Sequence, residues 1–230
     1  MPPTLDARVG FLGKLPARGD FVRRDVAHDF AEGWDTWLAA GIAASRAQLG
    51  EGWVAAFLEA PVWRFTLAQG VLGGGVAGLF FPSVDRAGRY FPLTLAAQHP
   101  RAQGLLAVPA WFNALQEVGV SALSEDSVFE AFEEAVAALP APPEPPLPQR
   151  FGHGLSGADP AVLLAATAPP VLFWTHGGAR VAPRILALPM LPAPEHFALL
   201  LQDEAAAAPP AQDPAFPPGP MDDLLFGSAA

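Results

Sequence analysis

The segment VAGLFFPSVDRAGRYFPLTLAA, residues 76–97, decides the fold of this chain. It contains two apolar runs, residues 76–84 and 90–97, which the short polar loop DRAGR connects. Within the loop, Gly88 can adopt the positive φ that a tight connection between antiparallel strands requires. Both runs are apolar at successive positions, which is typical of strands buried on two faces. The segment therefore predicts an antiparallel hairpin within a sheet that helices cover on both sides.

The flanking sequence supplies the remaining elements of this sheet and its covering layers. Residues 62–68 are expected to form a further strand, and residues 170–189 a second hairpin that turns at Gly177 and Gly178. Apolar residues at a spacing of 3.6 predict a long helix that Asp29 and Glu32 cap and Gly50 ends. Helices are predicted at residues 29–49, 53–59, 110–123, 127–139, 160–166 and 194–201. The expected fold is α/β, with a mixed, largely antiparallel sheet in a three-layer α-β-α sandwich.

Changes in composition along the chain predict its domain organisation. Residues 1–203 are expected to form a single α/β domain, in which the proline-rich residues 140–149 are an extended connector. Residues 204–230 replace core-forming residues with Ala, Pro, Asp and Gly, which predicts a disordered acidic tail. The tail contains GPMDDLLFG, an acidic and apolar segment that an ordinary tail sequence explains and that a groove on a partner could also bind.

Charge and composition exclude several classes of function. The formal net charge is −10, which repels phosphodiester backbones and argues against a nucleic-acid partner. The sequence contains no cysteine, so it has neither a disulfide nor a thiolate metal site. The N-terminal residues lack the features of a secretory signal, and the least charged stretch is interrupted by glycines and Pro82. A cytoplasmic protein without an integral membrane segment is expected.

The N-terminal segment VGFLGKLPARGDFVRR, residues 9–24, concentrates positive charge on this acidic chain. It is not a nucleotide-binding Walker loop, because Leu15 and Pro16 follow Gly13-Lys14 where that motif has Ser or Thr. Pro16 and Gly19 favour a turn, because Pro16 fixes φ and Gly19 allows a left-handed residue. Asp20 can accept backbone N–H bonds or pair with Arg18, Arg23 or Arg24. The segment is interpreted as a corner of the fold that a partner could also recognise.

The loop at residues 82–92 carries the residue types of a serine hydrolase. Ser83 and Asp85 with His176 could form a catalytic triad, and His153 is an alternative base. The G-x-S-x-G turn that exposes such a serine is absent, and Ser and Asp in turns more often satisfy backbone groups. The five histidines have no metal-ligand spacing, so neither a metal nor a cofactor is predicted.

The two charged loops are therefore the candidate functional site. We expect them to form adjacent surfaces that either recognise a protein partner or brace one another. The candidate residues are Lys14, Arg18, Gly19, Asp20, Arg23, Ser83, Asp85, Arg86 and Arg89.

The combination of these segments resembles a known family. GFLGKLPARGDFVRRD, WDTWLAAGIAASRAQLGEGW, PVWRF, FPSVDRAGRYFPLTL and FWTHGG occur in the order and spacing of the TagF (ImpM) family of bacterial type VI secretion-associated proteins. The resemblance extends over about residues 8–202. It implies an α/β sandwich without known catalytic activity that restrains secretion after translation, through binding of a forkhead-associated-domain protein or other components on the cytoplasmic side. The alternatives are the serine hydrolase with Ser83, Asp85 and His176, and a structural subunit of the secretion assembly.

Overall fold

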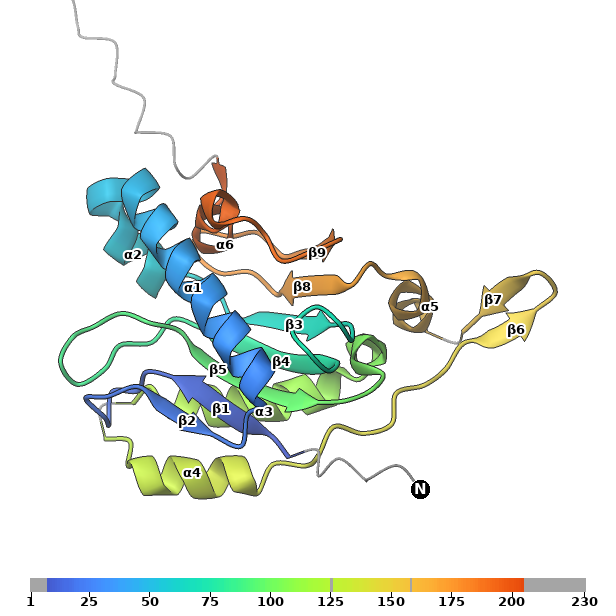
Figure 1. Cartoon of the computed structure of the whole chain (residues 1–230), viewed down its shortest axis with the longest axis horizontal. Helices are drawn as coiled ribbons and strands as arrows, with labels where there is room; N and C mark the ends of the chain where they lie inside the picture. Colours follow the sequence, from blue (N-terminus) through green and yellow to red (C-terminus); the bar gives the residue numbers. More distant parts are fainter. Residues whose placement is uncertain (1–7, 125, 158, 205–230) are drawn as a thin grey trace, which may run out of the picture.

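The computed structural model describes residues 8–124, 126–157 and 159–204. Seven strands of this part of the chain form one sheet in the order β2-β1-β5-β4-β3-β8-β9, and all neighbouring strands are antiparallel (Figure 1). The strands of this sheet are β1 (Gly10–Gly13), β2 (Val22–Arg24), β3 (Trp63–Leu67), β4 (Val76–Phe81), β5 (Leu93–Gln98), β8 (Val171–Thr175) and β9 (Arg184–Leu188).

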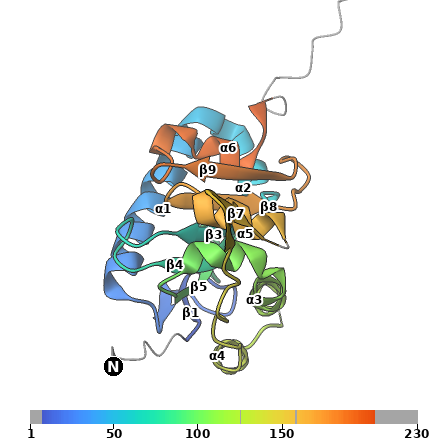
Figure 2. The ribbon, with the colours of Figure 1, turned by 90° about the vertical axis from the view of Figure 1, so that its right-hand side faces the viewer.

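Helices cover both faces of the sheet, as the expected three-layer sandwich requires (Figure 2). One face packs against α1 (His28–Leu49), α2 (Trp53–Leu58) and α6 (Ala198–Leu201). The other face packs against η2 (Ala102–Ala107), α3 (Pro109–Ser121) and α4 (Phe129–Ala137), and α5 (Pro160–Thr167) lies against η2. Two further 3-10 turns, η1 (Gly50–Gly52) and η3 (Pro194–His196), precede α2 and α6.

The β4–β5 hairpin confirms the prediction for residues 76–97, with shorter strands. The strand pairing ends at Phe81 opposite Leu93, because Pro82 and Pro92 cannot donate a backbone hydrogen bond to a sheet. An isolated bridge between Val84 and Tyr90 continues the hairpin, and Gly88 has a φ of 77° in the turn, as expected. The connection is therefore a long loop, residues 82–92, that extends beyond the end of the sheet.

Strand alternation distributes the core between the two faces. In β3, Phe65 faces α1, where its ring lies 4.5 Å from the ring of Trp34, while the neighbouring Arg64 and Thr66 face the other way. The buried indole of Trp34 donates a hydrogen bond to Thr94 Oγ1 at 3.0 Å. Gly41 allows the close contact between α1 and the C-terminal turn, because a Cβ there would lie 2.2 Å from the Phe197 ring.

The predicted cap of α1 was wrong, and one hairpin was not predicted. The cap of α1 is Ala27 without a side-chain hydrogen bond, because the helix begins at His28 and Asp29 already lies in its first turn. Residues 140–148 have no regular secondary structure, but Gln149 begins the separate hairpin of β6 (Gln149–Phe151) and β7 (Gly154–Ser156), which the sequence did not indicate. Figure 1 shows this hairpin projecting from the body.

Two further expectations concern the ends of the chain and the membrane. Apart from Glu204, the predicted acidic tail at residues 204–230, with its GPMDDLLFG segment, lies outside the described residues. Among the helices that the structure describes, none has both the length and the apolar character needed to cross a bilayer.

Candidate interaction site

Two loops that are distant in sequence lie side by side at one end of the sheet. The β1–β2 connection, residues 14–21, contacts the β4–β5 loop, residues 82–92, through main-chain and side-chain hydrogen bonds. The backbone N–H of Arg86 donates to the carbonyl of Arg18 at 3.0 Å. The hydroxyl of Ser83 donates to the carbonyl of Lys14 at 2.7 Å, and the Arg89 guanidinium donates to the carbonyl of Gly19. The two loops therefore form one unit.

Asp85 is the centre of this unit. Its side chain has no exposed surface, and its Oδ2 accepts from Lys14 Nζ at 2.5 Å and from Arg89 Nε at 2.7 Å. Its Oδ1 accepts from the backbone N–H groups of Ala87 and Arg89, both at 2.9 Å. Burial by itself raises the pKa of Asp85, but the hydrogen bonds from Lys14, Arg89 and Ala87 outweigh it and hold the pKa well below its ordinary value. The carboxylate is thus ionised and fully paired.

The candidate residues divide into two groups. The first group, which we call the brace, joins the two loops by internal contacts and consists of Lys14, Gly19, Ser83, Asp85 and Arg89. The remaining candidates, Arg18, Asp20, Arg23 and Arg86, are exposed.

Two expectations about the first loop were wrong. Asp20 has no ion pair or hydrogen bond in the described part of the chain, because the turn leaves its side chain exposed. The carboxylate that pairs with a cation of this loop is that of Asp85, which binds Lys14. Gly19 does not have a positive φ; in this segment Gly13 and Asp25 do, with φ of 133° and 52°. Gly19 instead contributes the carbonyl that Arg89 binds.

The exposed cations come from the outer strand β2 and from the two loops. Arg23 and Arg24 lie on β2, which ends the sheet and has no neighbour on its other side among the described strands, and the backbone of Arg86 is hydrogen-bonded to that of Arg18. We call this surface the basic edge; its residues are Arg18, Phe21, Arg23, Arg24 and Arg86. Arg18 pairs with Glu130 at 2.7 Å and lies over the Phe129 ring, and Arg24 pairs with Glu133 at 2.5 Å. In residues 8–204 as far as they are described, neither the Arg23 nor the Arg86 side chain has a hydrogen bond or an ion pair.

An aromatic side chain accompanies these cations. Phe21, which immediately precedes β2, is 43% exposed, and its ring packs edge-on against Phe91 of the β4–β5 loop at 5.5 Å. This exposed ring was missed at the level of sequence, because only its contact with Phe91 fixes it beside the arginines. The basic edge thus combines unpaired positive charge with an anchored apolar group.

The structure does not assemble the serine triad. Ser83 is buried and its hydroxyl donates to the Lys14 carbonyl, while Asp85 is occupied by Lys14 and Arg89. His176 lies in the β8–β9 connection, and no histidine of the described chain is hydrogen-bonded to Ser83. The described residues also contain no group of three or more His, Cys, Asp or Glu side chains with the geometry to hold a metal ion.

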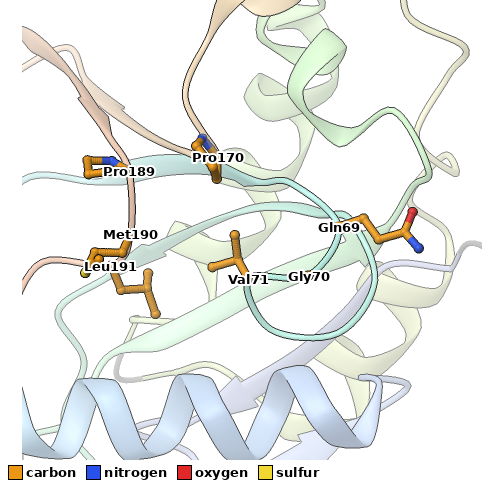
Figure 3. A pocket seen from close by; sticks show the side chains of 7 residues that line it. All are labelled: Gln69, Gly70, Val71, Pro170, Pro189, Met190 and Leu191. Atoms are coloured by element: carbon orange, nitrogen blue, oxygen red, sulfur yellow. The ribbon is translucent and has the colours of Figure 1, made fainter.

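A cavity of about 570 Å³ lies elsewhere, between the β3–β4 connection and the end of β9 (Figure 3). Its lining is mainly apolar, and it includes no titratable side chain. The lining residues are Gln69, Gly70, Val71, Pro170, Pro189, Met190 and Leu191. It therefore offers no acid, base or nucleophile.

Comparisons with known proteins agree with the fold. A family model described as TagF N-terminal domain, type VI secretion system-associated, matches residues 10–139, which include both loops. The crystal structure of PA0076 from Pseudomonas aeruginosa PAO1 is 40% identical in sequence, with a TM-score of 0.74, and the match covers 91% of this chain and 100% of that chain. No curated protein matches the chain.

Proposed function

This chain belongs to the TagF family of type VI secretion-associated proteins, and from that membership we propose that it is a non-enzymatic accessory protein that restrains secretion after translation. It does so by binding a protein partner through the basic edge. The partner that we propose is a forkhead-associated-domain component of the secretion system, and the site of action is the cytoplasm.

The observation that carries this proposal is the unpaired positive charge of Arg23 and Arg86 on a protein with a net charge of −10. An acidic protein repels acidic partners overall, so a local cationic surface selects a partner whose negative charge is placed opposite it. Complementary charge of this kind increases the association rate and suppresses wrong partners.

The brace supports binding by holding the surface in one conformation. Arg86 is fixed through its backbone bond to Arg18, and the loop that carries it is anchored by Asp85. A surface that is ordered before binding loses less conformational entropy on association. The open edge of β2 adds backbone donors and acceptors that an extended segment of the partner can pair with, beside the exposed ring of Phe21.

The test is charge reversal at the two unpaired arginines. The double variant R23E/R86E is expected to weaken binding of the purified forkhead-associated-domain partner at least about tenfold, measured by titration calorimetry, because it replaces attraction with repulsion. Its thermal unfolding is expected to match that of the wild type, since within the described chain neither side chain makes a hydrogen bond or an ion pair.

The matched control is R150E, which reverses an exposed arginine on the projecting β6–β7 hairpin. This variant is expected to bind the partner like the wild type. R150E reverses one charge and R23E/R86E reverses two, so a loss of binding free energy by R150E about half as large as that of the double variant would show that net charge alone matters. Unchanged binding by R23E/R86E would refute the basic edge as the binding surface. Size-exclusion chromatography of the mixture separates a stoichiometric regulator from a polymerising subunit.

A further inference from the structure

A second charged group, distant from the two loops, lies buried beneath α3. Arg64 is at a position of β3 where alternation points the side chain away from α1 and toward α3, and the residue is only 4% exposed. Its register partners on the two neighbouring strands are Leu79 and Trp174. An arginine at such a position is unusual, because removing a guanidinium from water is costly unless a negative charge compensates it.

The contacts of Arg64 do not provide that compensation. Its Nη2 donates to two neutral amides of α3, Asn113 Oδ1 at 2.8 Å and Gln116 Oε1 at 3.0 Å. The guanidinium lies 5.9 Å from the centre of the Phe112 ring. Within the described chain, Arg64 has no ion pair with a carboxylate, and its Nε and Nη1 have no hydrogen-bond acceptor. Burial lowers the pKa of Arg64, which reflects the same missing compensation.

The two amides that contact Arg64 also line an open cavity. Its volume is about 390 Å³, and its lining residues are Asn113, Gln116, Glu117 and Val120 of α3. Asn113 and Gln116 are surface residues of the helix, so their side chains can turn without disturbing the core. When they turn, their amide N–H groups can donate to an anion that approaches Arg64.

Apolar side chains lie on the same face of the sheet as Arg64. Trp174 lies opposite Ile185 of the outer strand β9, and Ile185 is 51% exposed. Because residues paired across a sheet share a face, Arg64, Trp174 and Ile185 form a row on the face that α3 covers only in part. Val120, at the cavity, is also exposed.

We propose that Arg64, Asn113 and Gln116 form a receptor for one carboxylate group, supplied by an acidic side chain of a bound polypeptide. The planar guanidinium has donors that match the two oxygens of a carboxylate, and Nε and Nη1 are unused. Val120 and Ile185 provide contacts for apolar residues beside the acidic one. Glu117 lines the same cavity and opposes the incoming charge. This site is independent of the basic edge.

The test is a titration of the whole chain, followed by the NMR signals of the Arg64, Asn113 and Gln116 side chains. The probes are acetyl-Leu-Glu-Leu-amide, the same tripeptide with Gln in place of Glu, and sodium acetate, at constant ionic strength. The Glu tripeptide is expected to give saturable shifts at these three residues, with affinity at least about tenfold higher than that of the Gln tripeptide. No saturable shift, or equal affinity for the Glu and Gln tripeptides, overturns the proposal.

The acetate titration identifies the source of the carboxylate. Tighter binding of the Glu tripeptide than of acetate supports a polypeptide ligand. Equal affinity of the two overturns that part of the proposal and assigns the site to free carboxylates.

Two variants sharpen the result. R64M is expected to abolish the shifts of Asn113 and Gln116, and E117Q is expected to strengthen binding of the Glu tripeptide about threefold, because it removes a nearby like charge. The matched control for E117Q is E51Q, which changes an exposed glutamate of η1 and is expected to leave the affinity unchanged. If R64M fails to fold, the comparison of the two tripeptides with the wild type still decides the question. Loss of partner binding at the basic edge leaves this result unaffected.

Discussion

Asp85 and Arg64 are both buried charges, but they differ in the number and charge of their partners. Asp85 has two cations and two backbone N–H groups around its carboxylate, so that both oxygens are occupied. Arg64 has two neutral amides on a single nitrogen and no counterion in the described part of the chain. A fully paired buried charge holds the structure together, whereas a buried charge without a counterion is available for a ligand.

The location of each charge supports this difference. Asp85 joins two loops that the sheet alone does not hold together, and it has no exposed side-chain surface. Arg64 lies in the interior of a strand that hydrogen bonds already secure on both sides, and the two amides that it contacts line a cavity. Removing one charge should therefore damage the fold, and removing the other should not.

The largest decrease in the free energy of unfolding is expected from D85N. This change keeps the size of the side chain but leaves Lys14 without its counterion and places amide hydrogens against cationic donors, which is expected to cost about 3 kcal/mol in the free energy of unfolding. The measurement is urea denaturation at neutral pH. The matched control is D20N, an exposed aspartate in the adjoining loop, for which a change of less than about 0.5 kcal/mol is expected. Equal effects of D85N and D20N would contradict the brace.

A smaller and gradual loss of folding stability is expected as the pH falls into the acid range. Because the folded-state pKa of Asp85 is depressed, its stabilising contribution is complete above the ordinary carboxyl pKa of about 4 and decreases as the pH falls below it. Wild-type stability should therefore decline more steeply below about pH 4 than that of D85N. R64M should keep the wild-type slope, since an arginine stays protonated throughout. Parallel acid profiles for the wild type and D85N would show that Asp85 does not carry this dependence.

The smallest change in the free energy of unfolding is expected from R64M. Methionine fills much of the same volume, removes a charge that nothing compensates, and leaves Asn113 and Gln116 able to hydrogen-bond with water, so the free energy of unfolding should change by about 1 kcal/mol or less. Denaturation under the conditions used for D85N provides the comparison. A loss as large as that of D85N would mean that Arg64 is a structural anchor for α3.

The local pattern of apolar and polar residues was sufficient to predict most helices and strands of the fold. Residues 76–97 predicted the β4–β5 hairpin, and the spacing of apolar residues predicted α1 within one residue of its start. Strands β1 and β2 were interpreted only as a corner, because each is very short and glycine, proline and charge interrupt their apolar pattern. Their strand character depends on pairing with β5 and with each other, which no local property encodes.

The candidate site was predictable in part. Charge and turn residues indicated the two loops, but they did not distinguish Arg89, whose contacts lie within the brace, from Arg86, whose side chain is unpaired. Arg64 gave one signal in the sequence, a charged residue inside the apolar run VWRFTLA. The sequence did not show which groups surround this arginine. The structure shows that Asn113 and Gln116 of α3 contact it.

By itself, the sequence determined the periodicity of its helices and strands, its charge, and the family to which it belongs, because these properties depend on residues near one another in the chain or on their order. The tertiary structure alone decided which carboxylate pairs with Lys14 and, among the residues that it describes, which surface arginines are unpaired and which buried cation lacks a counterion. Electrostatic pairing depends on distance through space, and Lys14 and Asp85 are brought within 2.5 Å only after β1 and β4 join the sheet on either side of β5.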